Sequence, residues 1–159
     1  MIRRTLLASV LTLSSAVAFT PAAGAVTTDI PFTGTVLSVC AFVPTAGLLG
    51  TTDNSTALDS TATGGLAGIA VLTCNTRTNL TVDAPIQTLG PSFTPTAASA
   101  TVSGNGLVNN VLSNLTGPAA PVALPIGVTT LNVNMRVVKD DFLEAGAYGY
   151  KVKLTATPQ

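Results

Sequence analysis

The stretch TTLNVNMRVV at residues 129–138 decides the fold class of this chain. Apolar and polar residues alternate one by one from Leu131 to Val137, which is the period of a β-strand that buries one face. The stretch AYGYKVKLTAT at residues 147–157 alternates in the same way. Its expected inward residues are Tyr148, Tyr150, Val152, Leu154 and Ala156. Because no stretch beyond residue 25 sustains a helical period of 3.6, the sequence predicts an all-β protein.

Shorter apolar or alternating runs lie upstream of these two stretches, bounded by clusters of Gly, Pro and Asn that end strands. The expected strands are residues 32–42, 66–74 and 80–84, and a hairpin of residues 99–102 and 107–112 around Gly104-Asn105-Gly106. Residues 43–65, 85–98 and 118–125 are expected to be loops, with room for one short strand in the first before Ser60. Several short strands in one domain favour a two-sheet β-sandwich.

The first 25 residues have the pattern of a signal peptide. Arg3 and Arg4 precede an apolar run over residues 6–19, and small residues close it. We expect cleavage after Ala25, a single mature domain over residues 26–159, and export through the periplasm to the cell surface or the medium. The run is too short to span a bilayer comfortably, so stable membrane insertion is not expected, and a retained anchor is the minor alternative. Adjacent arginines also leave twin-arginine export open.

The charge of the mature chain is small and scattered. Five basic and seven acidic residues remain after residue 25, which gives about −2 by counting. Nucleic acids and anionic membranes attract basic patches, so neither is an expected partner.

The two cysteines, Cys40 and Cys74, both lie in the exported part, where oxidation is favoured. We expect a disulfide between them. Closing this loop should stabilise the fold by about 3–4 kcal/mol, because it lowers the entropy of the unfolded chain. Two buried free thiols are the alternative.

The composition offers few of the residues that catalysis commonly needs. The chain has no histidine, the commonest general base and metal ligand. Asp140, Asp141 and Glu144 crowd into one loop, where solvated charges of a turn are the simpler interpretation. The sequence therefore predicts no enzyme, no cofactor and no metal site, with a hydrolase based on these acids kept as a remote hypothesis. Tyr148 and Tyr150 are expected in the core, although an exposed pair could stack on a sugar.

Three short motifs, in this order, resemble chaperone–usher pilins and the related spore coat protein U domains. Phe32-Thr33-Gly34-Thr35-Val36 leads into Cys40 as their first strand does, and Val71-Leu72-Thr73-Cys74 is similar to their second cysteine strand. Glu144-Ala145-Gly146-Ala147-Tyr148 followed by the last alternating stretch looks like their closing turn and final strand.

The resemblance implies an immunoglobulin-like sandwich that lacks one strand, which the N-terminal segment of the next subunit supplies. The donor residues would be Val26, Ile30 and Phe32. The implied function is a structural subunit of a surface fibre or coat, with self-association or related subunits as partners and a periplasmic chaperone as helper. Only six residues separate Ala25 from Phe32, so a shortened donor and a self-complete relative that does not polymerise both remain open. A monomeric module that binds a glycan or a protein through its long loops is the alternative function.

Overall fold

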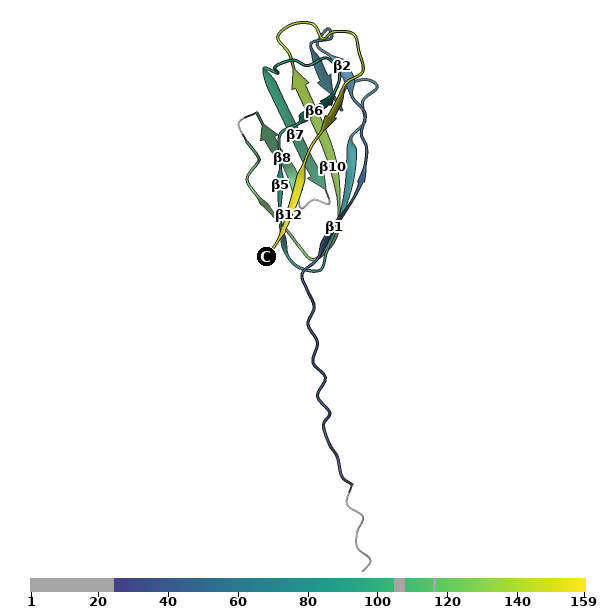
Figure 1. The fold of residues 1–159 in the computed structure, drawn as a ribbon, viewed down its shortest axis with the longest axis vertical. Helices are drawn as coiled ribbons and strands as arrows, with labels where there is room; N and C mark the ends of the chain where they lie inside the picture. The colour runs from purple at the N-terminus through teal and green to yellow at the C-terminus, as the bar shows by residue number, and fades with distance from the viewer. Residues whose placement is uncertain (1–24, 105–107, 116) are drawn as a thin grey trace, which may run out of the picture. The chain divides into compact units, whose positions relative to one another are not determined.

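The computed structural model describes residues 25–104, 108–115 and 117–159 (Figure 1). The expected signal peptide therefore lies outside the described residues, apart from Ala25. Contacts divide the chain into residues 1–35 and a domain of residues 36–159. Residues 25–35 carry no secondary structure. The described part of the chain contains strands and no helix, so the all-β prediction is confirmed.

The described residues of the domain form twelve strands. They are β1 (Cys40–Thr45), β2 (Gly50–Thr52), β3 (Ala57–Asp59), β4 (Gly68–Cys74), β5 (Thr78–Val82), β6 (Ile86–Leu89), β7 (Ala97–Gly104), β8 (Val108–Asn114), β9 (Val122–Leu124), β10 (Gly127–Val138), β11 (Gly149–Lys151) and β12 (Leu154–Pro158).

The first layer of the sandwich is a seven-stranded antiparallel sheet built around β10. One edge of β10 pairs with β4 and then with β3, and its other edge pairs with β7. The sheet continues from β4 to β1, from β3 to β2 and from β7 to β8. β10 can pair with three neighbours because it is long, with twelve residues.

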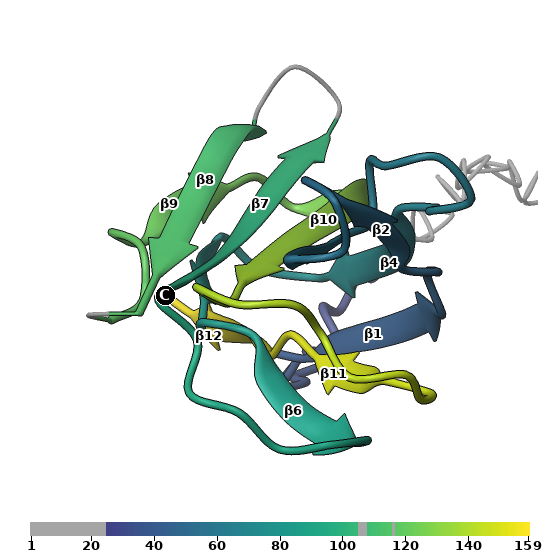
Figure 2. The ribbon, with the colours of Figure 1, turned by 90° about the horizontal axis from the view of Figure 1, so that it is seen from above.

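The second layer consists of two small sheets, β12-β5-β9 and β11-β6. Only Val152 and Lys153 separate β11 from β12, and both strands run along the same side of the domain (Figure 2). The last strands of the chain thereby form one edge of this layer.

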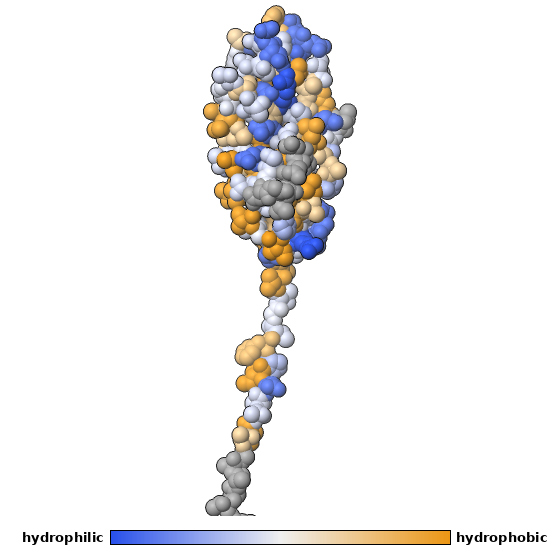
Figure 3. All heavy atoms as spheres, turned by 180° about the vertical axis from the view of Figure 1, so that it is seen from behind, coloured by the Kyte–Doolittle hydropathy of each residue, from blue (hydrophilic) through white to orange (hydrophobic). Residues whose placement is uncertain are grey.

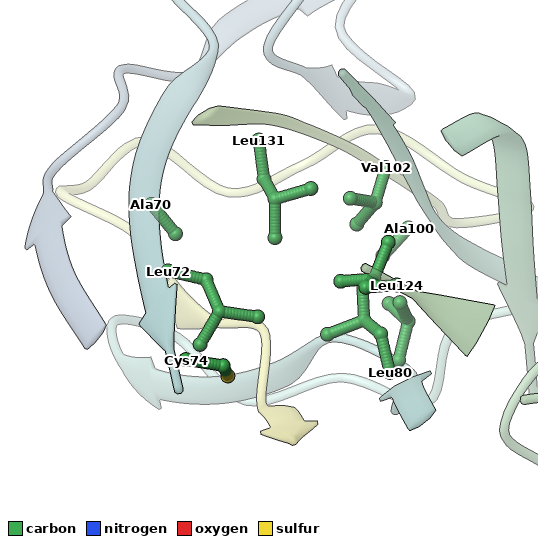
Figure 4. Packing of buried hydrophobic residues seen from close by; sticks show 9 residues of the cluster. Ala70, Leu72, Cys74, Leu80, Ala100, Val102, Leu124 and Leu131 are labelled. Atoms are coloured by element: carbon green, nitrogen blue, oxygen red, sulfur yellow. The ribbon is translucent and has the colours of Figure 1, made fainter. Parts of the chain in front are cut away.

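The core lies between the two layers and is made by the alternation that the sequence predicted. Leu72 and Leu131 point inward from the first layer, and Leu80 and Leu124 from the second (Figure 4). All four are at most 2% exposed. Each such side chain stabilises the fold by about 1.5–3 kcal/mol through burial. Ser113 is also fully buried, where its hydroxyl donates to the carbonyl of Asp83 and accepts from the amide of Ala100.

Most of the predicted elements are present. β4, β5, β7, β8 and β10 match expected strands within a few residues. β7 pairs with β8 as the predicted hairpin requires, although its turn at residues 105–107 lies outside the described part. The disulfide between Cys40 and Cys74 is confirmed.

The expected strand over residues 32–42 is wrong for residues 32–39, because β1 begins at Cys40. Cys40 pairs with Cys74, the last residue of β4. Since β4 ends there, it offers no backbone partner to the residues before Cys40.

The expected last strand is divided into β11 and β12. β12 pairs with β5 and β11 pairs with β6. These two partner strands are themselves separated, since β5 ends at Val82 and β6 begins at Ile86, after a proline that lacks an N–H donor. The amide of Asp83 still donates to the carbonyl of Lys153 across this break.

The three expected loops contain short strands: β2 and β3 in residues 43–65, β6 in residues 85–98, and β9 in residues 118–125. Each has only three or four residues, too few to produce a periodic signal, and each depends on a neighbouring strand.

Candidate functional site

A long apolar groove of about 1090 Å³ opens between the two layers. β1 forms one wall with Phe42 and Pro44, and the opposite wall consists of β11 and β12. The floor includes Ala70, Val133 and Met135 from the first layer.

Both walls of the groove are open strand edges. Among the described residues, β1 pairs only with β4, β11 only with β6, and β12 only with β5. Unpaired edges of this kind carry backbone N–H and C=O groups that another strand can bind.

Side chains that point into the groove alternate correctly but are incompletely covered. Tyr150, Val152 and Leu154 are half-buried, whereas their neighbours Lys151 and Lys153 are exposed. On the other wall, Phe42 is half-buried although its cross-strand neighbour Leu72 is only 2% exposed. The inward face of each edge strand therefore lacks the cover that the central strands have.

Small residues of β4 contribute to the floor of the groove, because Gly68 and Ala70 line it. Along the inner face of β4, Gly68 and Ala70 precede the larger Leu72. Val152 lines the groove as well, whereas Leu72 does not.

The predicted donor residues lie in the segment of residues 25–35. Val26, Ile30 and Phe32 are 96%, 70% and 93% exposed. The sequence prediction missed the length of this segment, because β1 begins eight residues later than expected, at Cys40. Residues 26–39 therefore precede the first strand, and alternate residues Val26, Thr28, Ile30, Phe32, Gly34 and Val36 share one side of the chain when it is extended.

Asn75 binds the residues that lead into the first strand of the domain. Its side-chain oxygen accepts from the amide of Val39, its amide group donates to the carbonyl of Leu37, and its backbone amide donates to the carbonyl of Val39. Three hydrogen bonds thus hold residues 37–39 just before β1.

The acids Asp140, Asp141 and Glu144 are exposed and do not line the groove. Asp141 accepts a hydrogen bond from the amide of Phe142. The described residues contain no group of three or more His, Cys, Asp or Glu side chains placed to hold a metal ion.

The two tyrosines near the last strands are half-buried at one end of the groove. The hydroxyl of Tyr148 donates to the carbonyl of Glu144, and its ring meets Phe93 edge to face at 6.3 Å between centroids. Burial, with the charge of Tyr148 as a smaller cause, raises the pKa of Tyr150.

One ion-pair network ties the short strands to the centre of the first layer. Arg136 binds Asp53 and Asp59, at 3.1 Å between its Nη1 and Asp59 Oδ2. Burial alone would raise the pKa of Asp59, but hydrogen bonds from Thr61 and Arg136 outweigh this effect and lower it. The network stabilises the end of the domain opposite the disulfide.

The fold and the groove define the class as an all-β, disulfide-bonded domain of the β-sandwich type. Comparison with protein-family models, curated proteins and solved structures gives no match. Within the described ranges, no helix is long and apolar enough to cross a membrane.

Proposed function

We propose that this protein is an exported structural subunit that assembles by strand donation, each copy filling the groove of another. The observation that carries the proposal is the groove between two unpaired strand edges, lined by half-buried apolar side chains. A single inserted strand would satisfy both edges and cover both walls, which is β-strand addition.

The occupant of the groove is residues 26–36 of a second copy. This segment presents Val26, Ile30, Phe32 and Val36 on one side, and all four are at least 70% exposed. Burial of each in the groove would contribute about 1.5–3 kcal/mol. The segment extends beyond the short donor that the sequence suggested, so its length no longer argues against donation.

One antiparallel register accounts for the insertion. It pairs residues 28–36 of the donor with residues 148–156 of the acceptor. In this register Phe32 lies beside Val152, in the groove that the small residues Gly68 and Ala70 also line. Gly34 then lies beside Tyr150, where its lack of a side chain avoids a clash with the large ring.

The direction of insertion determines the kind of assembly. A donor antiparallel to β12 runs toward the end of the domain that carries Tyr148, and its own domain follows there. Every copy then meets the next in the same head-to-tail way, which gives an open polymer and not a closed dimer. An immunoglobulin-like sandwich with one strand missing, completed between copies, is the architecture we infer.

Export belongs to the same proposal. The signal-peptide pattern, the disulfide and the small net charge support secretion through the periplasm to a fibre or coat at the cell surface. An open groove exposes apolar surface before assembly, so a periplasmic chaperone that covers it is an expected partner.

Removal of the donor tests the proposal. A chain that starts at Ser38 should not polymerise, and a synthetic peptide of residues 26–37 should bind it and raise its melting temperature. The control peptide exchanges Phe32 for Asp. A truncated chain that still polymerises, or that ignores the native peptide, contradicts strand donation.

A further inference from the structure

Four large apolar side chains are exposed at the end of the domain where the chain enters it. Leu37, Val39, Ile126 and Val128 are 75%, 58%, 63% and 63% exposed. Asn75 holds Leu37 and Val39, while Val128 pairs with Thr73 close to the disulfide. Hydrophobic residues gather near this end on the face shown in Figure 3. We call these four residues the base patch.

The opposite end of the domain presents one exposed aromatic residue on a well-fixed loop. Phe142, 65% exposed, belongs to residues 139–147, between β10 and β11. The amide of Lys139 donates to Thr56, and that of Leu143 to Ser55. The carbonyl of Phe142 also accepts from the Lys139 ammonium at 2.9 Å. The loop thus holds Phe142 in place without covering its ring.

The two apolar surfaces cannot meet within one copy. Val128 is near the first residue of β10 and Lys139 follows its last, so the length of one strand separates them (Figure 1). Twelve residues of extended chain span about 36 Å. A contact between these surfaces must join different copies.

We infer that the base patch of one copy packs against Phe142 of a second copy. This second copy is the acceptor, whose groove holds the donor segment of the first. The inference rests on the proposed strand donation. When Val36 occupies the last position of the groove, beside Tyr148, only three residues remain before Cys40 of the donor. Three extended residues reach about 10 Å, so the base of the donor must lie at the end of the acceptor that carries Phe142.

Charge at the two ends agrees with this contact. Arg77 is exposed and lies beside Pro125. Pro125 directly precedes Ile126 in the chain, so Arg77 is close to the base patch. Asp140 and Asp141, both exposed, precede Phe142, and with Glu144 they outnumber Lys139 on this loop, which is therefore negative by counting. Opposite charges around an apolar centre favour one orientation of two partners. The polymer is therefore held by the inserted strand and by a second contact between domains.

Oxidative cross-linking tests this second contact. The double variant Phe142→Cys with Ile126→Cys is polymerised, oxidised and boiled in detergent without reductant. We expect a ladder of covalent multimers. The matched control, Phe142→Cys with Leu112→Cys, places the second thiol on another exposed residue, in β8, and should give no ladder.

The outcomes separate this inference from the proposed function. Polymers visible by electron microscopy without cross-links above the control overturn the domain contact and leave strand donation intact. Covalent dimers from Ile126→Cys alone overturn it as well, because bases would then face each other. A chain that forms no polymer overturns both. Phe142→Ser, which adds no thiol, should shorten the polymers without changing the melting temperature of the unassembled protein.

Discussion

Cys40 and Cys74 lie directly opposite each other in the register of β1 and β4 and are joined by a disulfide, with 4.2 Å between their Cα atoms. β1 has no second strand partner among the described residues. The disulfide therefore fixes one wall of the groove to the sheet at the base of the domain. Cys40 Sγ also lies 3.3 Å from the hydroxyl of Thr78 in the other layer, which brings both layers together at this point.

Loss of the disulfide should destabilise the domain. The pair Cys40→Ser and Cys74→Ser opens a loop with a sequence separation of 34 residues and should lower the free energy of unfolding by about 3–4 kcal/mol. Urea denaturation of the chain with its donor peptide bound measures the change. Wild-type protein treated with reductant should behave like the double variant, and an unchanged unfolding midpoint in both would refute this role.

Phe32 should dominate the binding of the donor segment. Phe32→Asp removes the burial of a large side chain, about 2–3 kcal/mol, and should weaken peptide binding to the truncated chain by about 30-fold or more. Calorimetry with synthetic peptides measures the affinity. Thr33→Asp, which introduces the same charge on the other side of the strand, should bind nearly as well as the native peptide. Equal losses for both peptides would contradict the proposed face.

The acceptor wall should show the matching asymmetry. Val152 lines the groove and is half-buried, whereas Thr155 is exposed on the outer face of β12. Val152→Asp places a charge where the donor must pack and should abolish polymerisation, because burial of an unpaired charge is costly. Thr155→Asp should polymerise normally. Polymer yield after ultracentrifugation reports the difference, with circular dichroism as the check that both variants fold.

Asp59 should make stability depend on pH in the acid range. Its pKa in the folded protein lies below the usual 3.8, so the unfolded chain takes up a proton first as the pH falls. The stabilisation is complete above pH 3.8 and is lost as the pH falls through the lower, folded value. Melting temperatures of wild type and Asp59→Asn should therefore converge on acidification from about pH 5 to pH 2. If the melting temperatures of the two proteins changed in parallel with pH, Asp59 would not be the cause of this pH dependence.

Much of the fold was predictable because strands that bury one face leave a period of two in the sequence. Residues 129–138 fall entirely within β10, and the side chains expected inward in the last stretch are the ones that face the core or groove. β2 and β9 were not predictable, since three residues carry no period and their pairing comes from distant neighbours.

The groove was less predictable than the strands. Val152 and Leu80 look alike in an alternating pattern, yet Leu80 is fully covered and Val152 is not. Whether an apolar face finds cover depends on the number and order of strands around it. The stretch from Phe32 to Val39 had the alternation of a strand but has no partner on β4, which ends at Cys74. The sequence did contain one signal of an open groove: this stretch has the pattern of a strand but has no strand partner in the described part of its own domain.

The position of Phe32 in an assembled sample tests the central claim most directly. A photo-reactive phenylalanine analogue at position 32, in a mixture of ¹⁴N- and ¹⁵N-labelled copies, allows mass spectrometry to separate cross-links between copies from those within one. We predict cross-links from position 32 to groove residues around Ala70 and Val152 in chains of the other isotope. Cross-links confined to chains of the same isotope, or cross-links that avoid the groove, would contradict the account.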